Sequence, residues 1–245
     1  MVQKSEQKNQ SEKVKRQGIF TKILVFFMAL PFTIFATMIM SVLVEWCVMY
    51  SCNKGPEEGV CKFVQFSPNM GSEHSRLMLR QEALYLNEHF KKSIMGSEPI
   101  KLAGETITWV DQNIFVPIGI NAYKVKAEHE KSWAWEYLMA AYNIVKVVVL
   151  RLCVLFLSLP AYLLFLVVGV TTGLVRRDLR KFGAGRESTD RFELSTRLIT
   201  PSVVLCFVVY LSWPNSINPA LIVVPFAALF GYALHLTTAN YKKYL

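Results

Sequence analysis

Residues Leu152–Leu174 read LCVLFLSLPAYLLFLVVGVTTGL, an apolar run without Asp, Glu, Lys or Arg, and the basic run VRRDLRK (175–181) follows at once. A helix rises about 1.5 Å per residue and the hydrocarbon core of a bilayer is about 30 Å thick, so a crossing needs roughly 20 residues. Three further runs are apolar enough to enter a bilayer: Ile23–Val44, Leu198–Trp213 and Ala220–Leu236. The sequence therefore predicts an all-α membrane protein with four transmembrane helices.

The last two runs, of 16 and 17 residues, are short for a full crossing and could instead form a re-entrant pair. Between them lies WPNSINP (213–219), whose two prolines and two asparagines favour the end of one helix and the start of another. We therefore expect a transmembrane hairpin over 198–236. The first run is longer than the apolar core of a signal peptide and has no good cleavage site after it, so we expect an uncleaved anchor over 23–44.

Charge is distributed unevenly along the chain, whose formal net charge is +9. Residues 1–22 carry six basic and two acidic side chains, residues 175–198 carry seven and four, and the tail 237–245 carries two basic ones. Residues 45–151 carry twelve of each sign. Because Lys and Arg are enriched in cytoplasmic loops, we expect a bacterial inner-membrane protein with both termini and the basic loop 175–197 in the cytoplasm. The segment 45–151 would then face the periplasm.

The predicted periplasmic segment shows apolar residues at helical spacing, which predict helices near 72–95 and 128–151. Between these helices, residues 106–110 and 114–118 are expected to form short extended pieces. The segment is too small for a large core of its own, so its helices should pack against each other or against a partner.

The second of these helices could continue without a break into the predicted span 152–174. Lys146 and Arg151 would then lie where the helix meets the headgroups. Long basic side chains at that depth commonly snorkel toward water, and we expect both residues to do so.

Few residues in the sequence suggest a catalytic or metal-binding site. Glu73 precedes His74, and His129 lies between Glu128 and Glu130, but neither spacing matches a metal-binding pattern. Polar surface residues are the favoured interpretation, ahead of a membrane enzyme that uses these groups. No phosphate-binding glycine loop or nucleophile elbow is present. We therefore expect no catalytic residues, no metal and no cofactor.

Two cysteines of the predicted periplasmic segment, Cys52 and Cys61, flank Gly55 and Pro56. An oxidising compartment would permit a disulfide between them. Cys47, near the expected membrane edge, leaves an odd number of cysteines in this part of the chain. The spacing alone therefore leaves open whether Cys52 and Cys61 are joined.

The strongest local signal is the run RRDLRKFGAGREST (176–189). Its first six residues could be only a stop-transfer cluster. That interpretation does not account for the two glycines and the Arg–Glu pair, which suit a hinge followed by a docking surface. We therefore predict a cytoplasmic partner-binding surface that consists of Arg176, Arg177, Arg180, Lys181, Gly183, Gly185, Arg186 and Glu187.

The run RRDLRKFGAGRES, directly after a long apolar span, resembles a family of integral membrane proteins from conjugative plasmids and integrating conjugative elements, the TraJ-like conjugal transfer accessory proteins. The layout is similar over nearly the whole chain, with an amino-terminal anchor, an extracytoplasmic segment and a carboxy-terminal helical hairpin. Where an aromatic–His element often follows in that family, this chain has TDRFEL (189–194). The difference indicates a divergent branch.

The resemblance implies an inner-membrane accessory or adaptor subunit of a type IV secretion apparatus for conjugative DNA transfer. Its expected partners are the coupling ATPase, other conjugation-channel membrane proteins, the lipid bilayer and further copies of the chain. Direct nucleic-acid binding is not expected, because the lysines of 1–22 are mixed with Glu and Gln and have no stacking aromatics among them. The alternative is a small transporter or channel subunit, although the predicted spans contain no carboxylate.

Overall fold

A computed structural model describes residues 19–52, 60–64, 71–89, 99–120, 133–182 and 189–241, and within these ranges the chain contains helices and turns but no strand. The elements are α2 (Ile19–Cys52), α3 (Val60–Val64), α4 (Glu73–His89), α5 (Pro99–Val110), the π-helix η1 (Asp111–Phe115), α7 (Trp133–Leu157), α8 (Leu159–Phe182), α9 (Thr189–Ser212) and α10 (Pro219–Ala239). The expected all-α fold is confirmed.

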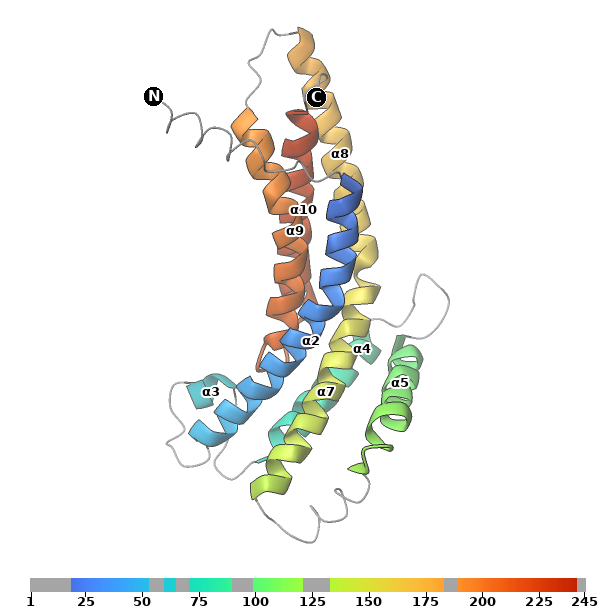
Figure 1. Ribbon diagram of the computed structural model, residues 1–245, viewed down its shortest axis with the longest axis vertical. Coiled ribbons are helices and arrows are strands. Elements are labelled where there is room, and N and C mark those ends of the chain that lie inside the picture. Colours follow the sequence, from blue (N-terminus) through green and yellow to red (C-terminus); the bar gives the residue numbers. More distant parts are fainter. Residues whose placement is uncertain are drawn as a thin grey trace, which may run out of the picture.

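The helices form an elongated structure with two parts (Figure 1). At one end, α8, α9 and α10 run side by side with the first half of α2. At the other end, α4 and α5 pack on α7, and the short α3 lies beside the end of α2. Both the turn between α9 and α10 and the junction of α7 with α8 lie where the two parts meet.

Four stretches are long and apolar enough to cross a membrane, as predicted: Met28–Cys52, Trp133–Arg180, Arg191–Ser212 and Pro219–Ala239. The last two contain 22 and 21 residues, more than the 16 and 17 of the apolar runs seen in the sequence. Each therefore meets the roughly 20 residues that a full crossing needs.

The predicted span 152–174 straddles the junction of two helices, which meet at Ser158. The Ser158 N–H donates to the Val154 carbonyl at 3.0 Å, and the Ala161 N–H donates to the Ser158 carbonyl at 3.0 Å. Pro160, between them, has no N–H and its ring crowds the preceding turn. The expected continuous helix is therefore interrupted at one residue.

The two extended pieces predicted at 106–110 and 114–118 are wrong. Residues 106–110 belong to α5, and residues 114–118 belong to η1 and the turn after it. Ala103 and Val110 are buried on one face of α5, and Ile107 packs against the main core cluster with Leu102. This packing, which includes contacts with α7, outweighs the extended preference of the β-branched residues.

Glycines bring α8 and α10 into close contact. A Cβ atom on Gly169 would lie 2.3 Å from the Gly231 carbonyl oxygen, and one on Gly173 would lie 1.8 Å from Thr238 Oγ1. Gly169 and Gly173 are four residues apart and so share one face of α8. Small residues at this spacing let membrane helices approach until their backbones touch.

Candidate functional site

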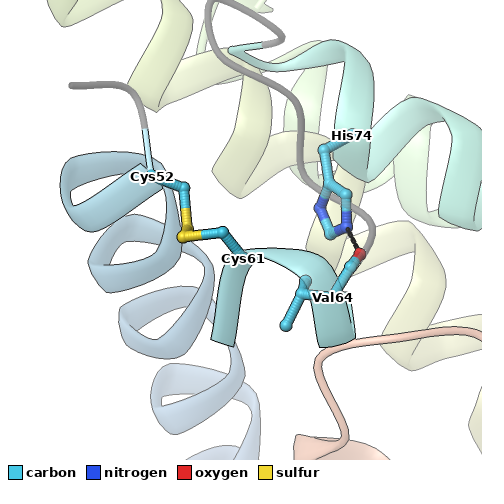
Figure 2. The surroundings of a disulfide bond; sticks show 4 residues. All are labelled: Cys52, Cys61, Val64 and His74. Carbon is cyan, nitrogen blue, oxygen red and sulfur yellow. Dashed lines mark hydrogen bonds between the residues drawn. A yellow bond between two sulfur atoms is a disulfide. The ribbon is translucent and has the colours of Figure 1, made fainter. Parts of the chain in front are cut away.

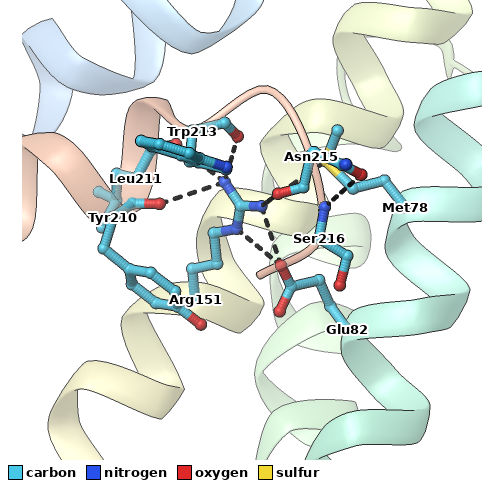
Figure 3. Close-up of polar contacts among 8 residues, drawn as sticks. All are labelled: Met78, Glu82, Arg151, Tyr210, Leu211, Trp213, Asn215 and Ser216. Carbon is cyan, nitrogen blue, oxygen red and sulfur yellow. Dashed lines mark hydrogen bonds and ion pairs between the residues drawn. The ribbon is translucent and has the colours of Figure 1, made fainter. Parts of the chain in front are cut away.

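Arg151, on α7, lies next to the turn that joins α9 to α10, residues 213–218, which we call the hairpin turn (Figure 3). Its Nη1 donates to the carbonyl of Trp213 at 2.7 Å and to those of Tyr210 and Leu211 at 3.2 and 3.4 Å. Its Nη2 donates to the Asn215 carbonyl at 2.7 Å. These carbonyls belong to the end of α9 and to the turn, where helical partners run out.

The charge of Arg151 is balanced by Glu82 of α4. Glu82 Oε1 accepts hydrogen bonds from Arg151 Nε at 3.1 Å and Nη2 at 2.9 Å, and both side chains are only 1% exposed. Burial raises the pKa of the Glu82 carboxyl above its usual value, and the Arg151 guanidinium opposes that rise. The predicted snorkelling of Arg151 is therefore wrong, because seven hydrogen bonds to protein acceptors hold it inside.

A second contact joins α4 to the hairpin turn. The Tyr85 hydroxyl donates to Asn218 Oδ1 at 2.7 Å, and the same oxygen accepts the Ala220 N–H at 2.9 Å. Asn218 is the N-cap of α10, so the tyrosine orients a side chain that already begins the helix. Together with the Glu82–Arg151 pair, this contact fastens α4 to both helices of the hairpin.

His74, which the sequence suggests is a surface residue, is buried between α2, α3 and α4 (Figure 2). Its Nδ1 lies 2.9 Å from Glu45 Oε1, and its Nε2 lies 3.0 Å from the Val64 carbonyl oxygen. Since both neighbours are acceptors, the doubly protonated ring satisfies both. Burial by itself lowers the pKa of His74, but the Glu45 carboxylate and the Val64 carbonyl more than offset it, and the pKa is raised.

Next to this histidine, Cys52 at the end of α2 is bonded to Cys61 of α3, with 5.6 Å between their Cα atoms (Figure 2). The structure thus has the pairing that the spacing left open. Val64 follows Cys61 by less than one turn, so the disulfide holds the carbonyl that His74 contacts. The end of α2 is therefore joined to α4 through α3.

We expect this contact to make stability depend on pH. A histidine whose pKa is raised by folding contributes stability below its unfolded pKa, and that contribution is lost as the pH rises through the folded pKa. The thermal midpoint of the detergent-solubilised protein should therefore rise as the pH falls from about 8 to about 6. In the Glu45→Gln variant the rise should shrink. An equal rise in both proteins would contradict the assignment.

Lys146, the other residue predicted to snorkel, forms an ion pair instead. Its Nζ lies 2.7 Å from Asp111 Oδ2, and the Tyr142 hydroxyl donates to Asp111 Oδ1 at 2.9 Å. Lys146 Nζ also lies over the Tyr142 ring, 4.3 Å from its centroid. Asp111 begins η1, so these contacts fasten the end of α5 to α7. As with Arg151, a partner distant in sequence displaces the expected contact with headgroups.

The predicted partner-binding residues divide into two sets. Arg176, Arg177 and Arg180 lie on α8, which continues to Phe182, so the expected loop 175–197 is helical at both ends. Lys181 is also helical. Outside the described residues lie Gly183, Gly185, Arg186, Glu187 and the side chain of Lys181.

The three arginines of α8 contact the end of α10. Arg176 Nη1 lies 3.4 Å from His235 Nε2, and Arg180 Nη1 donates to Asn240 Oδ1 at 3.1 Å. Arg177 lies over the Tyr241 ring, 5.8 Å from its centroid. The sequence indicated the basic cluster but not these partners, which are about 60 residues further along the chain.

These features define a multi-pass helical membrane protein in which α4, which is not one of the four membrane-spanning candidates, is fastened to α7 and to the hairpin of α9 and α10. A protein-family model described as "IncC plasmid conjugative DNA transfer protein DtrJ-like" matches residues 66–242. The chain belongs to this DtrJ-like family, and the expected link to conjugation is confirmed. The match includes Glu82, Arg151 and all of α7 to α10. No curated protein and no solved structure matches the chain.

Proposed function

We propose that this conjugative DNA transfer protein is a non-enzymatic adaptor of the bacterial inner membrane, which docks the coupling ATPase of the type IV secretion apparatus. The family supplies the link to DNA transfer, and the four apolar helices supply the membrane. The observation that carries the adaptor role is the basic end of α8, which extends past the apolar part of the helix and leads into Arg186.

The orientation in this proposal follows from charge. The start of α2, the end of α8, the start of α9 and the end of α10 all lie toward the same end of the structure (Figure 1). Nearly all the excess of Lys and Arg lies in the segments that adjoin these helix ends, whereas residues 45–151 are balanced. Because positive loops stay on the cytoplasmic side, we place that end in the cytoplasm and α3, α4 and α5 in the periplasm.

Within the basic surface, the residues after α8 suit protein docking best. Arg176 and Arg180 are engaged with α10, whereas Arg186 and Glu187 follow in the sequence after the end of α8 at Phe182. An acidic patch on the ATPase would be the complementary surface, and such patches set specificity and association rate.

Charge reversal at Arg186 tests the proposal. The Arg186→Glu variant should lower co-purification with the coupling ATPase and the frequency of plasmid transfer by about tenfold, since a like-charge contact costs at least about 1.4 kcal/mol. Its abundance in the membrane should not change. The control is Arg191→Glu, an exposed arginine at the start of α9. Normal transfer with Arg186→Glu, or an equal defect with Arg191→Glu, would refute docking at this site.

A further inference from the structure

We propose that the adjoining ends of α8 and α10 form a specific binding site for the phosphate headgroup of an anionic phospholipid. The site is formed by Thr172, Arg176 and Arg180 on α8 and by His235 and Asn240 on α10. The three α8 residues follow one another at intervals of four and so form one row along the helix. This site does not depend on docking of the ATPase.

The arginines near the end of α8 have no carboxylate partner among the described residues. Within the described part of the chain, none of the guanidinium groups of Arg176, Arg177 and Arg180 has a carboxylate within ion-pair distance. By contrast, Arg151 is paired with Glu82 and Arg197 with Glu193. The contacts of the α8 arginines are a histidine, an amide and an aromatic ring, which orient a guanidinium without neutralising it. Arg176 and Arg180 are two positive charges one turn apart without a carboxylate partner among the described residues, which suits the binding of an anion.

The guanidinium of Arg176 also has N–H groups that make no hydrogen bond among the described residues. Arg176 is exposed, and among the described residues only its Nη1 makes a side-chain hydrogen bond. A guanidinium presents five N–H donors in a planar fork that matches the oxygens of a phosphate. Asp178 is turned by about 200° around the helix from Arg176, which is nearly the opposite side. The nearest acidic residue on α8 therefore does not point toward Arg176.

The surroundings favour a lipid over a protein. Val175 and Leu179, which adjoin Arg176 and Arg180 in α8, and Tyr232 of α10 are 59%, 66% and 59% exposed, so apolar side chains are accessible near the charges. Tyr232 stacks on His235 with 6.5 Å between ring centroids, and tyrosine is enriched at membrane interfaces. His235 lies one turn before the end of α10 at Ala239. The charged headgroup of a lipid could thus contact the arginines, and its acyl chains could contact the apolar side chains beside them.

The close packing of α8 and α10 holds the residues of the proposed site next to one another. Gly169 and Gly173 bring the α8 and α10 backbones into contact within the two turns that precede Arg176. Thr172 Oγ1 lies 3.0 Å from His235 Nδ1, so the histidine is held between Thr172 and Arg176. Basic pockets between membrane helices bind the headgroups of cardiolipin and similar lipids, and a site held in shape before binding loses less entropy on binding.

Native mass spectrometry of the full chain, released from bilayers of phosphatidylcholine with phosphatidylglycerol or cardiolipin, tests the proposal. The variant Arg176→Gln/Arg180→Gln should retain about fivefold fewer anionic lipids than the wild type. The control Arg191→Gln/Arg197→Gln removes two exposed charges from α9 at the same end and should retain them. Equal losses in both variants would show diffuse attraction only and would overturn the site, as would full retention in the first variant.

Two further arms complete the test. Inorganic phosphate added during release should not displace the lipid, and displacement would overturn the lipid assignment in favour of a free anion. If the first variant fails to fold, the wild-type thermal midpoint is decisive. It should rise when phosphatidylglycerol is added to phosphatidylcholine vesicles and stay unchanged when zwitterionic phosphatidylethanolamine is added instead. An equal response to both lipids would overturn the proposal.

Discussion

Replacement of Arg151 by methionine should lower the free energy of unfolding by about 3–5 kcal/mol, the range found when one partner of a buried ion pair is removed. The variant leaves the Glu82 carboxylate buried without its counter-charge, and it leaves the carbonyls of Trp213 and Asn215 without their donor. Protonation of Glu82 can relieve part of the cost, because its pKa is already raised by burial. The lost carbonyl contacts cannot be relieved in this way.

Two controls separate the ion pair from other effects. The double variant Glu82→Leu/Arg151→Met removes both charges, so it should be more stable than Arg151→Met alone, although the turn carbonyls stay unpaired. Arg80→Met removes an exposed arginine from α4, the helix of Glu82, and should change stability by less than about 0.5 kcal/mol. Chemical unfolding in detergent measures all three. If Arg151→Met is no less stable than Arg80→Met, the buried contacts do not exist.

The Arg151→Met variant should also loosen the hairpin turn. Arg151 is the group that ties the hairpin turn to α7 and α4, so without it the turn 213–218 should become accessible to protease. Tyr85, which still contacts Asn218, should keep the start of α10 in place. Cleavage is therefore expected in the first half of the turn, and mass spectrometry of the fragments would locate it. Cleavage that instead begins in α5 would contradict this role.

The membrane part of the fold could be predicted because its signal is local. Twenty or so apolar residues in a row have few interpretations other than a membrane span. The helix ends could not be predicted in the same way, because hydropathy shows where lipid ends and not where the helix ends. Thus α9 begins at Thr189 and includes the charged pair Glu193 and Arg197, outside the predicted apolar run 198–213.

The buried polar contacts could not be predicted because their partners are distant in sequence. Arg151 and Glu82 are 69 residues apart, and Arg151 and Asn215 are 64 apart. Seen alone, a basic residue beside an apolar run is most simply assigned to the headgroups. His74 shows the same problem, since Glu45 and Val64 come from other helices. The basic cluster of α8 could be found because its residues are neighbours in the sequence.

Replacement of Gly169 by leucine should be the most damaging single change in the membrane part. Its Cβ atom would lie 2.3 Å from the Gly231 carbonyl oxygen, which is backbone on the facing helix and cannot rotate away. The helices α8 and α10 would have to separate along their length, and overpacking of this kind costs about 3 kcal/mol or more. Even Gly169→Ala should destabilise, despite the better helix propensity of alanine.

The matched control is Gly104→Ala on the exposed side of α5, where a Cβ atom would meet nothing within 4 Å. This variant should stabilise the protein by about 0.5–1 kcal/mol, because alanine restricts the unfolded chain and favours the helix. The opposite signs of the two glycine-to-alanine changes would show that contact between the helices, and not propensity, determines the effect at Gly169. Stabilisation by both would mean that α8 and α10 do not pack through their glycines, and the proposed lipid site, which depends on that packing, would lose its support.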